Sequence, residues 1–155
     1  MRDDVERDTT SEDDGGGSSA DGLTVAVGRP RTDVVVVRAV GEIDLLTAPR
    51  WARALEAALR LPVDIETGPA VDRGVDGRAR RRLVCDLTGV TFLGASGLAV
   101  LVETADRAAS LGVCPVVVAD TRPVLRVLAL TGLDRHLPVD ARVVDAVTST
   151  MDRCA

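Results

Sequence analysis

The chain contains no lysine and no tyrosine, and its aromatic side chains are limited to Trp51, Phe92 and the single histidine, His136. The absence of lysine excludes Schiff-base and acyl-lysine chemistry, since all 19 basic residues are arginines. With so few aromatic rings, any core must be built from Val, Leu, Ile and Ala. Hydrophobic residues make up 46% of the 155 residues, which is enough to form one domain.

Long apolar runs are also absent, so no transmembrane helix is expected, because a span needs about 18 apolar residues. The N-terminus is acidic and polar, unlike a secretory signal, and a cytoplasmic location is expected. The spacings of Cys85, Cys114 and Cys154 match no zinc or redox motif. There is no phosphate-binding loop of the G-x-x-x-x-G-K-[ST] type. We therefore expect no metal site, no cofactor and no membrane association.

Charge is unevenly distributed. Residues 1–22 hold eight acids and two arginines, a net charge of −6, so with −5 for the whole chain the remaining residues carry about +1. The rest of the chain lacks the strongly basic character of a nucleic-acid-binding surface. Residues 1–22 contain one large apolar side chain besides Met1 and are predicted to form a disordered acidic tail. Residues 150–155 are predicted to be a frayed C-terminus.

Residues 83–101 combine the strongest structural signals. Leu83–Leu87 has the composition of a buried strand, Thr88–Val90 that of a turn, and Gly94–Gly97 precedes apolar residues at helical spacing. Ser96 is thus predicted at or near a helix N-terminus, just past the carboxyl end of a strand. Ligands and partners commonly meet α/β sheets at that edge, and the helix dipole favours negative charge there.

The remaining chain alternates strand and helix patterns, which predicts an α/β domain over residues 23–149. We expect a mostly parallel sheet of about five strands with about four helices, and an antiparallel first strand joined to the second by a hairpin. Thr47 is the predicted N-cap of the first helix. The glycine- and proline-containing segment 62–82 is predicted to be a flexible insertion, with Arg78–Arg82 as its solvated end. The other predicted strands are 23–27, 33–40, 115–119 and 136–139, and the other predicted helices run from about 47 to 61, from 124 to 130 and from 140 to 149.

Two segments resemble a known family. The sequence DLTGVTFLGASGLAVL, residues 86–101, resembles the signature of STAS domains, the anti-sigma-factor antagonist family. GEIDLLTA, residues 41–48, resembles a second conserved segment of that family, in the expected upstream position. Gly94 and Ala95 stand where family members often have aspartate and serine or threonine.

The resemblance implies a non-enzymatic protein that binds an anti-sigma factor with serine kinase activity and thereby releases a sigma factor. Ser96 corresponds to the serine that the partner phosphorylates, and a phosphatase that reverses the modification is a further expected partner. The residues expected to contact the partner are Asp44, Leu45, Thr47, Thr91, Leu93, Ala95, Ser96 and Gly97.

Other interpretations of Ser96 stay open at this point. It can simply cap the second helix. It can be a hydrolase nucleophile, although the second glycine of the G-x-S-x-G motif would lie one place early, and His136 with Asp134 would have to complete a triad. A STAS scaffold or small-ligand-binding module without a phospho-switch is the alternative within the family. Asp86 is expected to bond local backbone, and Asp44 to anchor a loop or contact a partner.

Overall fold

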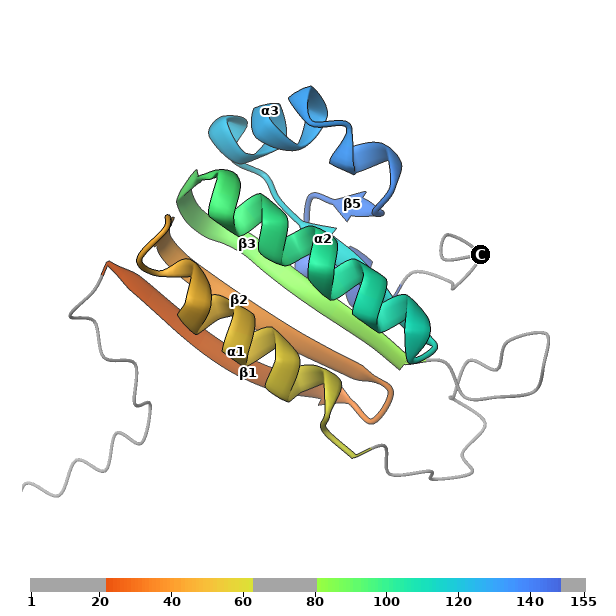
Figure 1. Ribbon diagram of the computed structural model, residues 1–155. Coiled ribbons are helices and arrows are strands. Elements are labelled where there is room, and N and C mark those ends of the chain that lie inside the picture. The colour runs from red at the N-terminus through yellow and green to blue at the C-terminus, as the bar shows by residue number, and fades with distance from the viewer. Residues whose placement is uncertain (1–21, 63–80, 149–155) are drawn as a thin grey trace, which may run out of the picture.

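A computed structural model describes residues 22–62 and 81–148 (Figure 1). The predicted acidic tail, apart from Gly22, lies outside the described residues, and so does the predicted C-terminal segment. Most of the predicted insertion also lies outside them. The domain boundaries assigned to these segments therefore stay predictions.

Five strands form one sheet in the order β1-β2-β3-β4-β5. The first strand runs antiparallel to the second and all other pairs are parallel, which confirms the predicted fold class. The predicted last strand at 136–139 is displaced, because residues 133–135 form a short 3₁₀ helix and pairing begins only at Val139. The strands are β1 (Leu23–Arg31), β2 (Val34–Ile43), β3 (Arg81–Leu93), β4 (Val113–Val118) and β5 (Val139–Asp140).

Four α-helices pack on the sheet: α1 (Ala48–Leu59), α2 (Ala95–Ser110), α3 (Arg122–Leu130) and α4 (Val143–Thr148). Helices α1 and α2 lie side by side over one face (Figure 1). Their apolar faces and the sheet enclose the larger core cluster, to which α3 also contributes. The smaller cluster lies on the other face and is covered by α4.

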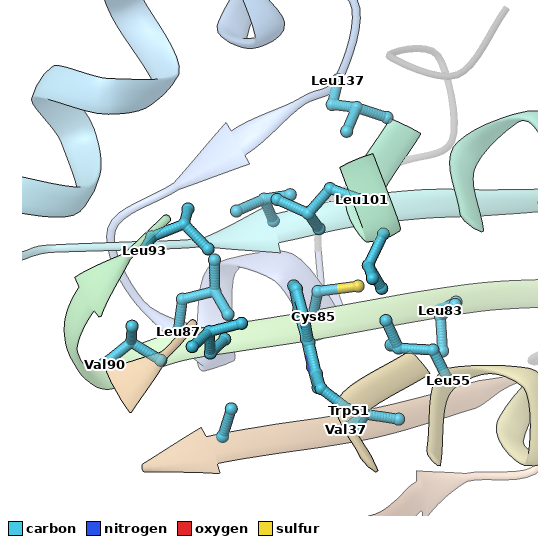
Figure 2. Close-up of a cluster of buried hydrophobic side chains, with 14 of the residues drawn as sticks. Val37, Trp51, Leu55, Leu83, Cys85, Leu87, Val90, Leu93, Leu101 and Leu137 are labelled. Carbon is cyan, nitrogen blue, oxygen red and sulfur yellow. The ribbon is translucent and has the colours of Figure 1, made fainter. Parts of the chain in front are cut away.

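Trp51 of α1 belongs to the larger cluster, together with Cys85 of β3 and Leu101 of α2 (Figure 2). Trp51 is fully buried and is surrounded almost entirely by aliphatic side chains, as the composition predicts. Cys85 is a free, buried cysteine, and this burial raises the pKa of its thiol to about 12. Cys85 therefore acts as a small apolar side chain in the core.

Strand β3 is longer than predicted, because the expected turn at Thr88–Val90 is part of the strand. Asp86 Oδ1 accepts hydrogen bonds from the backbone N and the Oγ1 of Thr88, at 3.0 and 2.7 Å, which confirms its local role. The register with β2 shifts at this point, so β3 accommodates an extra residue as a bulge. Asp86 and Thr88 therefore form the local hydrogen bonds that are typical of a turn, but the pairing of β3 with β2 continues past these residues.

The position of Arg82 contradicts the prediction that this residue belongs to a solvated loop end. Its side chain is buried, and Nη1 donates to the carbonyl oxygens of Ala146 and Val147, at 2.6 and 3.1 Å. Arg82 thus belongs to β3 and holds the last turn of α4, instead of forming a solvated loop end. In α4, Val144 is 61% exposed, whereas Val143 and Val147 pack against the smaller core cluster.

Candidate functional site

The carboxyl ends of β2 and β3 bring together two segments that are far apart in the sequence. Ile43 pairs with Leu93 at the last position of the two parallel strands. The backbone N of Gly94 donates to the carbonyl oxygen of Ile43 at 2.9 Å, which continues the contact past the strand ends. Residues 44–47 therefore lie beside residues 91–97.

Asp44 and Thr47 hold the first of these segments in a closed network. Asp44 Oδ1 accepts from the backbone N of Leu46 and of Thr47, each at 2.9 Å. The hydroxyl of Thr47 accepts from the backbone N of Asp44 at 2.9 Å and donates to the carbonyl oxygen of Glu42 at 2.8 Å. These bonds, led by the one from the Thr47 backbone, lower the pKa of Asp44 below its usual value. Asp44 is thus a loop anchor.

Thr47 does occupy the N-cap position of α1, as predicted, but its side chain does not cap the helix. The hydroxyl is already used within the loop, and Pro49 in the first turn needs no hydrogen-bond partner for its nitrogen. The prediction from the local sequence was therefore correct for the start of the helix and wrong for the role of the Thr47 hydroxyl.

Ser96 is the second residue of α2, and Gly94 is the N-cap. The interpretation of Ser96 as the helix cap is therefore wrong. The Ser96 side chain is half-buried, and its hydroxyl makes no hydrogen bond to any residue that the structure describes. A hydroxyl in this position is available to another molecule, next to the positive end of the helix dipole.

Gly97 allows α2 to start directly against the sheet. A Cβ at this position would lie 2.6 Å from Leu93 Cδ1 and 2.7 Å from Ile43 Cγ2. Both distances are shorter than real contacts, so only glycine fits without movement of these two side chains or of the helix. The close approach fixes the position of Ser96 relative to residues 44–47.

The structure places all the predicted contact residues at this one edge, at different depths. Some of them form the surface and others lie beneath it. Leu45, Thr91 and Ala95 are exposed, Asp44 and Ser96 are half-buried, and Thr47, Leu93 and Gly97 are buried. The buried three shape the surface instead of presenting a side chain to a partner.

Two exposed apolar side chains at the same edge were not predicted. Leu46 is 86% exposed and Phe92 is 50% exposed, and both flank predicted contact residues. The period of two along a strand provided a signal for Phe92, because a buried Leu93 requires its neighbour to face the other way. For Leu46 the signal was weaker: two adjacent leucines in a loop between a strand and a helix rarely both reach the core.

The triad interpretation gains no geometric support. Asp134 and His136 are both exposed, in and just after the 3₁₀ helix. Neither the Ser96 hydroxyl nor the His136 imidazole is hydrogen-bonded to another side chain within residues 22–62 and 81–148. In the same ranges there is no cluster of three His, Cys, Asp or Glu side chains with the geometry to hold a metal ion. No helix among the described residues has the length and apolarity needed to cross a membrane.

The fold is shared with known proteins. The family model of the STAS domain matches residues 26–146. A crystal structure of an anti-sigma factor antagonist from Mycobacterium paratuberculosis is 32% identical, with a TM-score of 0.64, over 84% of this chain and 95% of that one. No curated protein matches the sequence.

More distant structures share the fold alone. SpoIIAA, an anti-sigma factor antagonist solved in its unphosphorylated form, is 14% identical, with a TM-score of 0.57, over 83% of this chain and all of that one. The murine anion transporter Slc26a9 is 18% identical, with a TM-score of 0.57; the match covers 77% of this chain but 18% of the transporter. Because the family model spans most of the chain and the mycobacterial antagonist matches along nearly its whole length, this chain belongs to the STAS domain family.

Proposed function

We propose that this STAS domain protein is an anti-sigma-factor antagonist. In this proposal it acts in the cytoplasm, binds an anti-sigma factor that is also a serine kinase, and frees a sigma factor. Phosphorylation of Ser96 by the same partner ends the interaction. The observation that carries the proposal is the Ser96 hydroxyl, which has no hydrogen-bond partner among the described residues and lies at the sheet edge that also carries exposed apolar side chains.

The proposed docking surface combines Ser96 with the apolar groups around it. Leu45 is 77% exposed and Leu46 is 86% exposed, and Phe92 comes from the adjacent strand end. Exposed apolar groups gathered at one place mark interaction sites in soluble domains. The network of Asp44 and Thr47 supports the two leucines, and such preorganisation lowers the entropic cost of binding.

The switch follows from electrostatics. A phosphoryl group adds a charge of about −1.5 to −2 at neutral pH. In the free protein the N-terminus of α2 and the surrounding water stabilise this charge. In the complex the same charge would be removed from water, and an unpaired charge in an interface costs several kcal/mol. Phosphorylation thus abolishes docking and leaves the fold intact.

The test is to incubate the purified protein with ATP and the anti-sigma kinase encoded nearest to its gene, and to measure the intact mass. We expect a gain of one phosphoryl group in the wild type and none in Ser96→Ala. Phosphorylation at another residue, or complex formation that is unchanged after quantitative phosphorylation of Ser96, would contradict the proposed switch.

The alternative is a STAS scaffold or small-ligand module without a phospho-switch. The observation that favours it is the N-cap of α2, where Gly94 supplies no side-chain cap although the family often has aspartate at this position. In that case the protein would bind its partner, and the mass would not change with ATP.

A further inference from the structure

The N-terminal segment joins the domain at the edge of the proposed docking surface. β1 runs antiparallel to β2, so Leu23 at its start pairs with Gly41 near the end of β2. The backbone N of Glu42 donates to the carbonyl oxygen of Gly22 at 3.0 Å. The starts of α1, α2 and α3 lie at the same end of the sheet as this junction (Figure 1). Residues 1–21 are therefore tethered beside the docking surface.

The sequence of this segment combines a block of acids with a spacer. Residues 3–14 hold seven acids and one arginine, a net charge of −6. Residues 15–20 read Gly-Gly-Gly-Ser-Ser-Ala, which is the composition of a Gly/Ser-rich linker. Such a linker has an average end-to-end distance of about 15 Å over the eight residues that separate Asp14 from Gly22. The two ends of the ten-residue strand β2 are about 30 Å apart, so the acidic block stays near this edge.

The described part of this edge attracts negative charge. Thr121 at the start of α3 donates through its hydroxyl to the carbonyl oxygen of Val90 at 3.4 Å, so α3 also begins here. None of the three helices has an acidic residue in its first turn or a side-chain cap, and each N-terminus is equivalent to roughly half a positive charge. The charged side chains of the edge include four arginines in the first two turns of α1 and α3 and three acids: Arg50, Arg53, Arg122, Arg126, Glu42, Asp44 and Asp120. These side chains contribute about +1, and the helix N-termini add to it.

The arginines of α1 and α3 are placed to meet the acidic block. Arg50 Nη1 donates to the carbonyl oxygen of Leu23 at 3.0 Å, so a cation lies where the segment leaves the sheet. Arg53 and Arg122 are exposed and form no ion pair with a residue that the structure describes. The start of α2 lies between those of α1 and α3 (Figure 1). A chain that contacts both outer helices therefore passes over the start of α2.

We propose that residues 3–14 bind in cis to the starts of α1 and α3 and thereby cover Ser96. The segment is an autoinhibitor that competes with the anti-sigma factor for the docking surface. Tethering favours this contact, because a short linker gives an effective concentration in the millimolar range. A phosphoryl group on Ser96 repels the acidic block, so the segment covers only the unphosphorylated edge. The contact needs no partner, but its regulatory role rests on the proposed function.

Amide chemical shifts of the full chain, without a partner, test the contact. The variant replaces each acid of the block by its amide, at Asp3, Asp4, Glu6, Asp8, Glu12, Asp13 and Asp14. We expect its shifts to differ from the wild type at the starts of α1, α2 and α3, and the differences to vanish at about 1 M salt, where the Debye length is about 3 Å. The matched control changes Thr9, Thr10 and Ser11 to alanine, keeps the charge, and should leave these shifts unchanged.

Two outcomes would overturn the contact. Shift differences confined to residues 22–24 would show that the acidic block does not reach the helix starts. Shift differences that depend on protein concentration would show that the block contacts a second copy of the chain instead of its own domain.

Variants of the domain then test the assigned arginines. Arg53→Gln and Arg122→Gln together should reduce the shift differences, because they remove two cations of the edge. Arg135→Gln changes an exposed arginine of the 3₁₀ helix, outside this edge, and is the control. Shift differences of the same size in the double variant and in the control would refute the assigned contact.

Binding of the anti-sigma kinase encoded nearest to the gene tests the regulatory role. The variant with the neutralised block should bind about three- to tenfold more tightly than the wild type at low salt, because its docking surface is no longer covered for part of the time. Equal affinities would overturn the autoinhibition. Absence of binding by both proteins would overturn the proposed function, and the regulatory role with it, but not the contact that the shifts measure.

Discussion

Ser96 lies in the first turn of α2 without capping it, so its substitutions separate stability from binding. Ser96→Ala should change the free energy of unfolding by no more than about 0.5 kcal/mol, since no hydrogen bond of the hydroxyl is lost. Ser96→Asp should be at least as stable as the alanine variant, because a negative charge suits this end of the helix.

Binding should follow the opposite order. Ser96→Ala should keep its affinity for the anti-sigma partner, whereas Ser96→Asp should lose about 2 kcal/mol or more by placing a charge in the interface. Urea denaturation and calorimetric titration measure the two quantities. Equal partner affinities for both variants would remove Ser96 from the docking surface.

Asp44 gives a pH-dependent prediction, because hydrogen bonds from the backbone of Thr47 and Leu46 lower its pKa below 3.8. A lowered pKa in the folded state means that the carboxylate stabilises the fold above pH 3.8, and that this stabilisation is lost as the pH falls through the lowered pKa. Asp44→Asn should therefore be less stable than the wild type at pH 7, and the gap should be smaller at a pH below 3.8. A gap that is identical at both pH values would show that the charge makes no contribution.

Gly97 should be the most sensitive glycine of the site. Gly97→Ala introduces a Cβ within 2.7 Å of Leu93 and Ile43, and such overpacking costs about 1–3 kcal/mol. Gly28→Ala is the control, since a Cβ there meets nothing within 4 Å. Thermal unfolding of the two variants gives the comparison. A Gly97→Ala variant as stable as the Gly28→Ala control would mean that α2 shifts freely on the sheet.

At the level of elements, Arg82 joins β3 to α4 through hydrogen bonds to the carbonyl oxygens of Ala146 and Val147. The guanidinium provides hydrogen bonds to carbonyl oxygens at the end of α4, a helix of only six residues. A cation at a helix C-terminus also interacts favourably with the helix dipole. The attachment of α4 therefore depends on a single buried side chain as well as on its valines.

Arg82→Met should lower the free energy of unfolding by about 2–3 kcal/mol, because two charge-assisted hydrogen bonds are lost. Arg142→Met removes an exposed pair with Asp145, which water and salt screen, and should be much less destabilising. Hydrogen exchange should show faster opening of α4 in Arg82→Met alone. Unchanged exchange in α4 would mean that the valine contacts suffice.

At the level of the whole molecule, the connection between α1 and β3 has its two ends held close together. Arg81 Nη2 donates to the carbonyl oxygen of Leu61 at 2.6 Å, and Arg29 Nη2 donates to that of Pro62 at 2.6 Å. Arg81 thus bridges directly from the start of β3 to the end of α1. A short connection can replace the residues between them.

Replacing residues 63–80 with about six glycine and serine residues should preserve cooperative unfolding and raise stability by up to about 1 kcal/mol, through the lower entropy of loop closure. Urea denaturation checks both points. A loss of cooperativity would show that the removed segment packs on the domain and would contradict the insertion hypothesis.

The sequence determined the fold class, the strand and helix order, and the edge at which Ser96 lies. These features follow from local patterns: the alternation of polar and apolar residues, the apolar runs, the glycines at helix ends, and the two motifs, each of which comes after a strand. In a parallel sheet, the ends of neighbouring strands necessarily meet at one edge. Residues 44–47 and 91–97 were assigned to one site because of the family resemblance, since the sequence alone did not show that their two strands are neighbours in the sheet.

The tertiary structure alone decided how each of these residues is used. Pairing with β2 carries β3 through the turn chemistry at Asp86 and Thr88, and contact with α4 turns Arg82 from a loop residue into a buried anchor. Packing against Ile43 and Leu93 sets Gly94, not Ser96, as the cap of α2. Each outcome depends on a partner that is distant in the sequence, and the free energy of such contacts exceeds the preferences of neighbouring residues.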